Sequence, residues 1–136
     1  MKHAAILAAL LPLCSQAGEL KLVMHATGLG GKTLYVAVHS SADGFPARTD
    51  KALKTGVVAA GDTTELTIPD VPPGEYAVAV FADINGNGKL DHNFIGIPSE
   101  PVGTSRDAKG RFGPPRFADA AFRIGDGVAE QSIHIK

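Results

Sequence analysis

The sequence predicts an all-β fold, an antiparallel β-sandwich of about seven strands with one long irregular loop. Apolar and polar residues alternate over 18–26, 34–39 and 63–68, which is the two-residue period of a half-buried strand. Glycine- and proline-rich turns separate these segments, and no helical period extends beyond a turn or two. Short strands with frequent turn signals are typical of a sandwich.

The expected strands follow one another along the whole mature chain. They cover 18–26, 34–39, 57–58, 63–68, 75–81, 119–124 and 130–135. The segment 75–81 is apolar on both faces, so we expect it at the centre of a sheet. Tyr76 follows a Pro-Pro-Gly turn, the position of the tyrosine corner in immunoglobulin-like sandwiches. Residues 51–54 are compatible with one helical turn. The stretch 94–116 has little periodicity, and such long loops are often functional.

The first 17 residues have the layout of a secretory signal peptide. A basic start is followed by an apolar run over 4–13 and by small residues at positions −3 and −1 of a cleavage site after Ala17. We therefore expect export of a single domain, residues 18–136, to the periplasm or out of the cell. The apolar run is too short to cross a bilayer as a helix. A leucine before Cys14 disfavours lipidation at that cysteine.

The composition of the mature chain excludes several classes of protein. Cleavage removes Cys14, and the remaining chain carries 12 basic and 14 acidic residues. Without cysteine there is no disulfide framework, no thiolate nucleophile and no zinc site with cysteine ligands. The near-neutral charge, with no basic stripe between aromatic residues, argues against nucleic acid as a partner. We expect a monomer that does not span the membrane.

The segment 83–91 follows the strand 75–81 and has the pattern of a calcium loop. Oxygen-bearing side chains occur at every second residue, and two glycines between them allow a tight backbone. The metal ligands we expect are Asp83, Asn85, Asn87, Lys89 (through its backbone carbonyl) and Asp91. Only two of these are anionic, so Ca²⁺ binding is expected to be weak, with a Kd of roughly 0.1–1 mM.

The same segment has a metal-free interpretation. Asn-Gly, which occurs here twice, is a strong signal for a tight turn because both residues tolerate positive φ. The twelfth position of the calcium pattern is Phe94 rather than the usual glutamate, so a distant carboxylate is needed to complete the site. Glu100, Asp107 and Asp119 are the candidates, and the sequence does not choose among them.

Four blocks of the chain resemble one known family. They are 72–91 (Pro-Pro-Gly-Glu-Tyr through the Asp83–Asp91 segment), 96–100 (Gly-Ile-Pro-Ser-Glu), 111–117 (Arg-Phe-Gly-Pro-Pro-Arg-Phe) and 119–122 (Asp-Ala-Ala-Phe). Their order and spacing are similar to those of a bacterial exported family catalogued as domain of unknown function 2141. The resemblance implies a small secreted or periplasmic β-sandwich with no established activity.

The turn before Tyr76 extends this resemblance to the fold. Its Pro-Pro-Gly-x-Tyr entry into a strand is also similar to transthyretin-like and collagen-adhesin B-type domains, which implies an immunoglobulin-like or transthyretin-like sandwich. Members of the family often carry a Gly-Phe-Ser-Asn-like stretch where this chain has Gly-Thr-Ser-Arg at 103–106. The resemblance therefore leaves the chemistry of that loop open.

The segment 111–117 is a second candidate site. Arg111, Phe112 and Arg116 combine two guanidinium groups, an aromatic ring and a stiff Pro-Pro, which can grip a carboxylate, a phosphate or a sugar. The alternative is that the phenylalanines fill the core and the arginines pair with Asp107 or Asp119.

Histidine metal sites and catalytic motifs are not indicated. The mature histidines (His25, His39, His92 and His134) form no H-x-H or H-x₃-H pair, and we expect them on polar, solvated faces. No nucleophile elbow, H-E-x-x-H or phosphate loop is present. The predicted function is a calcium-ordered surface that binds an unknown envelope protein or glycan. A metal-free binding module for peptide or glycan is the alternative, and hydrolysis by paired carboxylates is a remote one.

Overall fold

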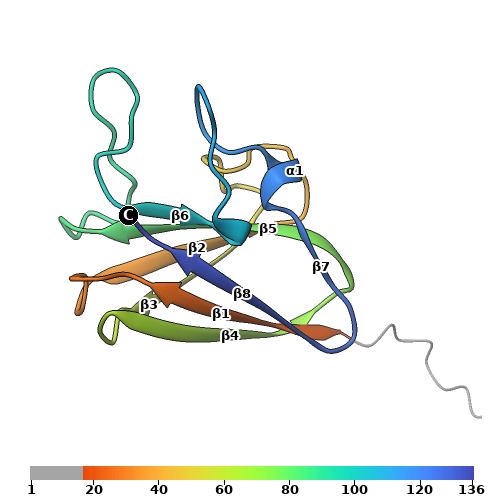
Figure 1. Cartoon of the computed structure of the whole chain (residues 1–136). Helices are drawn as coiled ribbons and strands as arrows, with labels where there is room; N and C mark the ends of the chain where they lie inside the picture. Colours follow the sequence, from red (N-terminus) through yellow and green to blue (C-terminus); the bar gives the residue numbers. More distant parts are fainter. Residues whose placement is uncertain (1–16) are drawn as a thin grey trace, which may run out of the picture.

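The computed structural model describes residues 17–136, and the predicted signal peptide falls on residues outside this range except for Ala17. The chain forms two layers of β-sheet that pack face to face (Figure 1). The strands are β1 (Gly18–His25), β2 (Thr33–His39), β3 (Leu53–Val58), β4 (Thr63–Val71), β5 (Gly74–Asp83), β6 (Val102–Thr104), β7 (Phe122–Ile124) and β8 (Val128–His134). A 3₁₀ turn, η1 (Ser105–Asp107), and a four-residue helix, α1 (Phe117–Ala120), complete the fold. The predicted β-sandwich is confirmed.

The smaller sheet has the order β4-β1-β8, and the larger has the order β3-β2-β5-β6 with β7 paired to β5. All pairs are antiparallel except one: β1 and β8 run parallel, with Leu22 opposite Gln131. The predicted antiparallel pairing therefore holds for every strand pair except this one. After β7 the chain crosses to the other sheet through a turn that presses against Gly18, where a Cβ would collide with the carbonyl oxygen of Gly125. The last strand therefore starts at the same end as the first.

The alternation along the predicted strands decides which side chains form the core. Leu20, Leu22 and Met24 of β1 are fully buried and meet Val36 of β2 and Val80 of β5 between the sheets. Burying one such side chain contributes roughly 1.5–3 kcal/mol. The predicted tyrosine corner is also present, since the Tyr76 hydroxyl donates a hydrogen bond to the Pro72 carbonyl at 2.6 Å.

Three local predictions were wrong. The irregular stretch 94–116 contains β6 and η1, the expected strand 119–124 is split between α1 and β7, and residues 53–54 belong to β3 rather than to a helical turn. One buried hydroxyl, that of Ser105, holds η1 and α1 in place. Ser105 Oγ accepts a hydrogen bond from Val78 N at 2.9 Å and donates one to Ala120 O at 2.6 Å, which ties η1 to β5 and α1. A contact between a side chain and a distant backbone leaves no periodicity in the sequence.

His39 is buried, with 2% of its surface exposed, and not solvated as predicted. Its ring lies edge-on to Phe45 at 5.1 Å, and Phe45 in turn meets Phe117 at 5.9 Å. Burial lowers the pKa of His39, because the charged imidazolium loses its water. The segment around Phe45 and the α1 segment thus cover one end of the outer face of the larger sheet and leave its other end open.

Candidate functional site

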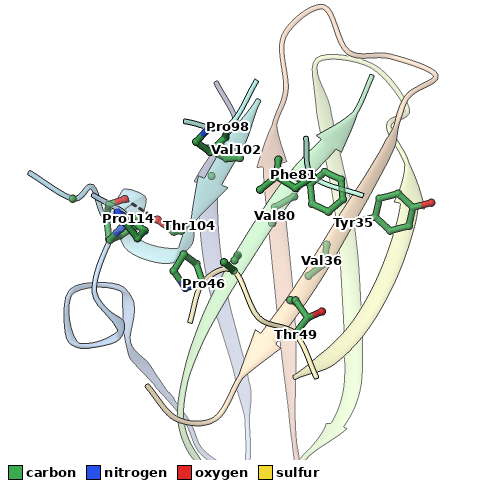
Figure 2. Close-up of a pocket in the computed structure, with 18 of the residues that line it drawn as sticks. Tyr35, Val36, Pro46, Thr49, Val80, Phe81, Pro98, Val102, Thr104 and Pro114 are labelled. Atoms are coloured by element: carbon green, nitrogen blue, oxygen red, sulfur yellow. Dashed lines mark hydrogen bonds between the residues drawn. The ribbon is translucent and has the colours of Figure 1, made fainter. Parts of the chain in front are cut away.

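The open end of the larger sheet presents an apolar floor. Because Val36 and Val80 point into the core, their neighbours Tyr35, Ala37, Ala79 and Phe81 must point outward. Tyr35 lies opposite Phe81 and Ala37 lies opposite Ala79 across the β2–β5 pair. The two aromatic rings stack with centroids 5.2 Å apart, as Figure 2 shows. Two alanines beside two rings leave a depression in the sheet surface.

Irregular segments build walls around this floor and turn it into a groove of about 1270 Å³. Residues 46–49, 88–98 and 107–115 contribute lining side chains or backbone, so the 83–91 segment and the 111–117 segment border the same groove. In Figure 2, Pro98 and Val102 lie at one margin of the floor, and Pro114 and Pro46 lie at another. The sequence predicts both bordering segments as candidate sites but does not predict the floor between them.

The ionisable groups that line the groove are mainly cationic. They are Lys54, Lys89, Lys109, Lys136, His92, His134 and Asp107. The one carboxylate is engaged already, since Asp107 Oδ2 lies 2.9 Å from His134 Nδ1. Four ammonium groups around an apolar floor favour a ligand with negative charge or many hydrogen-bond acceptors.

The 83–91 segment folds inward around Asp83, which is only 4% exposed. Asp83 Oδ1 accepts a hydrogen bond from Gly86 N at 3.0 Å, and Oδ2 accepts one from Gly88 N at 2.8 Å. Both glycines have positive φ, 73° and 75°, a conformation in which a side chain is strained. The two glycines thus take the positive φ that the Asn-Gly repeat predicted, and the resulting backbone places two amides on the Asp83 carboxylate.

Glu100 closes this segment from outside it. Its carboxylate is 7% exposed and accepts hydrogen bonds from Ile84 N at 2.7 Å and from Asp91 N at 3.0 Å. The two amides lie at the two ends of the segment, so one side chain fixes both. Of the three distant carboxylates that the sequence offered, this is the one that the fold brings to the segment.

The remaining predicted ligands also face one another. Asn85 and Asn87 both donate from their amide nitrogens to the Asp91 carboxylate, with Asn87 Nδ2 at 2.9 Å from Oδ1. These bonds from Asn87 and Asn85 lower the pKa of Asp91. The backbone N–H of Lys89 donates to Asn87 Oδ1 at 3.0 Å. Three predicted side-chain ligands thus lie in one hydrogen-bonded cluster, and the fourth, Asp83, binds backbone amides of the same segment.

The donor set decides how a cation would fit this cluster. Within residues 17–136, no group of three or more His, Cys, Asp or Glu is arranged as a metal site. A bound Ca²⁺ would therefore depend on amide and backbone oxygens beside Asp83 and Asp91, a composition that Ca²⁺ accepts. None of the ion pairs in the described part of the chain involves Asp83, Asp91 or Glu100.

The other two distant candidates are engaged elsewhere. Asp107 binds His134, and Asp119 accepts two hydrogen bonds from the guanidinium of Arg116, at 2.9 and 3.1 Å. The hydrogen bonds and charge of Arg116 lower the pKa of Asp119. Asp107 and Asp119 were candidates to complete the 83–91 segment, but in this structure both side chains are held by other partners.

The predicted partner-binding residues behave differently from one another. Phe112 is fully exposed and does not fill the core, whereas Phe117 packs against Phe45. Arg116 is paired with Asp119, as the alternative interpretation expected. Arg111 is exposed next to Phe112. Arg111 and Phe112 thus remain available at the surface, and Arg116 supports its own segment.

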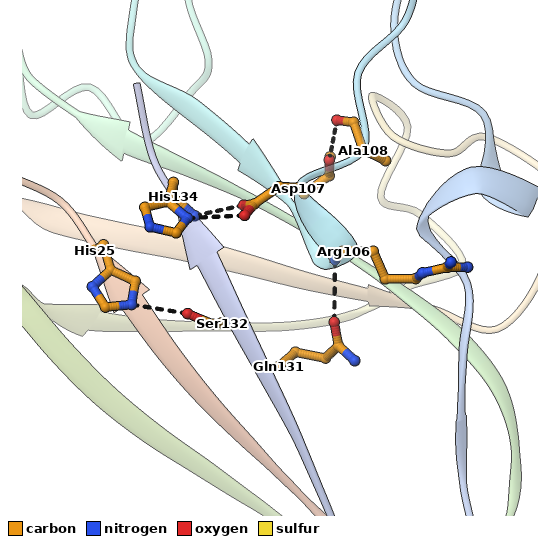
Figure 3. Close-up of polar contacts among 8 residues, drawn as sticks. His25, Arg106, Asp107, Ala108, Gln131, Ser132 and His134 are labelled. Atoms are coloured by element: carbon orange, nitrogen blue, oxygen red, sulfur yellow. Dashed lines mark hydrogen bonds and ion pairs between the residues drawn. The ribbon is translucent and has the colours of Figure 1, made fainter.

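A second polar cluster, which the sequence did not suggest, lies at the edge of the smaller sheet (Figure 3). The rings of His25 and His134 stack at 4.6 Å, His25 Nε2 lies 2.8 Å from Ser132 Oγ, and His134 binds Asp107. Burial alone would raise the pKa of Asp107, but bonds from the backbone and ring of His134 outweigh it and lower that pKa. The serine and the aspartate bind different imidazoles, so no single histidine links them as in a hydrolytic triad.

A comparison with known protein families gives a match. A family model described as "Uncharacterized protein conserved in bacteria (DUF2141)" matches residues 29–132. The chain belongs to this family. The match includes both segments that border the groove, all of β2 to β7 and residues 128–132 of β8, and it leaves out β1. No curated protein and no solved structure matches the chain.

One further property of this DUF2141 domain concerns membranes. No helix in the described residues is long and apolar enough to cross a bilayer.

The signal that could have revealed the groove was present in the sequence: β5 is apolar on both faces, although only one of them enters the core. An apolar outer face implies a cover or a ligand.

Glu100→Ala is expected to lower the free energy of unfolding by about 2–4 kcal/mol, because it leaves two part-buried N–H groups without an acceptor. Glu100→Gln, which keeps one acceptor oxygen, is expected to lose less. Urea denaturation measures both. Glu75→Ala, at an exposed position of β5, is the control and is expected to change stability by less than about 0.5 kcal/mol. Equal losses for Glu100→Ala and Glu75→Ala would contradict the role of Glu100.

Proposed function

We propose that this protein is an exported binding domain of the bacterial envelope that holds an extended ligand, a peptide or a glycan, in the groove of the larger sheet. The observation that carries the proposal is the floor, where Tyr35 stacks on Phe81 beside two alanines. Flat aromatic surfaces bind the apolar faces of sugar rings and of peptide side chains. Alanines at Ala37 and Ala79 leave the space that a ligand needs.

The walls suit the same kind of ligand. The lining lysines, such as Lys54 and Lys109, offer rotatable donors to hydroxyl, carbonyl and carboxylate oxygens. The groove is partly open to solvent, and three irregular segments border it. Loops on a rigid sheet are common carriers of binding residues. Arg111 and Phe112, the residues predicted from sequence as partner-binding, adjoin its rim.

The second part of the proposal concerns the wall made by the 83–91 segment. We propose that Ca²⁺ bound by Asp83, Asn85, Asn87, the Lys89 carbonyl and Asp91 orders this wall. Three neighbouring carboxylates, including Glu100, without an ion pair in the described chain support a cation there. Rotation of the Asn85 and Asn87 amides by half a turn would replace their Nδ2 groups beside Asp91 with oxygens. A cation between these oxygens and the Asp91 carboxylate would then be bound by both. The alternative is a metal-free wall, held by the hydrogen bonds alone.

Filling the groove is expected to abolish ligand binding. Ala79→Trp places an indole over the floor without changing the core, since Ala79 faces outward. The measurement is binding of the labelled protein to glycan and peptide arrays, with the signals of the unmodified protein expected to disappear in the variant. Val23→Trp, on the outer face of β1 in the opposite sheet, is the matched control and is expected to keep them. Signals that survive Ala79→Trp would place the ligand elsewhere.

Calcium is expected to stabilise the fold by mass action. For a Kd of roughly 0.1–1 mM, roughly 10 mM Ca²⁺ adds about 1.4–2.7 kcal/mol, seen as a higher Tm than in chelator. Asp91→Asn removes one of the two anionic ligands and is expected to reduce this Tm difference. Asp126→Asn, in the exposed turn after β7, is the control. If the Tm is the same in calcium and in chelator, the metal-free wall is the correct interpretation.

A further inference from the structure

Two loop tips expose large apolar side chains on one side of the molecule. Phe94 and Phe112 are fully exposed, and Ile95 and Ile97 beside the first are more than half exposed. Figure 1 shows both loops rising away from the layer that contains β1, β4 and β8. Both also border the groove, so they flank one common surface. A water-exposed phenylalanine contributes nothing to folding, which makes the pair a candidate docking surface.

The Phe94 tip pairs much of its backbone internally. Asn93 Oδ1 accepts hydrogen bonds from Ile95 N and Ile97 N, both at 3.0 Å, and Asn93 N donates to Ile97 O at 2.9 Å. The Phe94 tip is therefore a closed turn in which the amides of Ile95, Gly96 and Ile97 have acceptors. In the other loop, a Cβ at Gly110 would collide with the Gly113 carbonyl, so the chain doubles back tightly before and after Phe112. A backbone that satisfies itself can enter an apolar medium at low cost.

Within the two tips themselves, the charged side chains are basic. Residues 92–99 and 108–118 contain no aspartate or glutamate, although Asp91, Glu100, Asp107 and Asp119 flank them, and Lys109 and Arg111 precede Phe112 directly. Basic groups beside exposed aromatic and aliphatic side chains are the combination by which proteins bind anionic membrane surfaces. A second copy of the chain fits less well, since it would oppose Lys109 and Arg111 to cations. A folded partner would need a concave complement to two separate tips, whereas a fluid lipid layer needs none.

We propose that the protein docks peripherally on an anionic lipid surface, with Phe94 and Phe112 inserted at the level of the headgroups and Lys109 and Arg111 against lipid phosphates. This inference goes beyond the groove-binding function. Phe94, Ile95 and Arg111 lie outside the groove lining, whereas Lys109 and Phe112 belong to it, so the Phe94 tip carries the part of the inference that is independent of the groove. The groove would then open toward the lipid surface.

The experiment places a reporter at the tip itself, because the apolar run 4–13 of the full chain is able to bind lipid by its own means. The protein contains no tryptophan, so Phe94→Trp introduces a single one. Its emission is expected to shift to shorter wavelength with phosphatidylcholine–phosphatidylglycerol vesicles and to be quenched by brominated lipid. Val128→Trp, exposed at the start of β8, is the matched control and is expected to show neither change.

Cosedimentation with the same vesicles tests the individual residues. Phe112→Ala is expected to lower the partition coefficient about tenfold. Lys109→Gln with Arg111→Gln is expected to remove the preference over pure phosphatidylcholine vesicles, and added salt is expected to weaken binding. Ala79→Trp is expected to bind vesicles normally, which separates this inference from the groove.

Three results would overturn the inference. One is an unchanged Phe94→Trp spectrum with anionic vesicles. Another is an equal spectral shift of Phe94→Trp with neutral and anionic vesicles, which would remove the role of the basic residues. The third is a spectral shift with polyglutamate but not with vesicles, which would assign the tips to an acidic protein partner.

Discussion

The two hydrogen bonds that the Glu100 carboxylate accepts are the interaction on which the proposed binding surface depends. Glu100 is buried, belongs to the segment leading into β6, and accepts the amides of Ile84 and Asp91 at the two ends of the 83–91 segment. A buried carboxylate is stable only when it is hydrogen-bonded or neutralised. Here two backbone donors meet that need, and the same two bonds fix the position of a groove wall. One side chain thus links the edge of the larger sheet to the loop that borders it.

The rest of the surface follows from how the outer face of the larger sheet is covered. Near His39, the segment around Phe45 and the α1 segment close over the sheet, and the imidazole is buried. Toward Tyr35 and Phe81 nothing in the described chain covers the same two strands, and a groove remains. The long loops end beyond this groove in exposed apolar tips. The outer face of the larger sheet is thus covered at its His39 end and open at its Tyr35 and Phe81 end.

Local features of the sequence predicted local features of the fold. The alternation of Leu20, Leu22 and Met24 predicted β1, and the turn before Tyr76 predicted the tyrosine corner, because both depend on neighbours along the chain. The 83–91 segment also turned inward as its Asn-Gly repeat suggested. The parallel β1–β8 pair, the burial of His39 and the choice of Glu100 over Asp107 and Asp119 were out of reach. Each depends on which distant segments meet, and a single sequence does not contain that information.

The most direct measurement of the central claim is native-state amide hydrogen exchange at Ile84 and Asp91. Both amides lie in a surface loop, yet each donates to the buried Glu100 carboxylate. After correction for intrinsic rates, they are expected to exchange at least about a hundredfold more slowly than the amides of Phe94 and Phe112 in the exposed tips. Exchange at Ile84 and Asp91 as fast as at those tips would mean that Glu100 does not hold the segment. The groove wall and the surface built on it would then lose their physical basis.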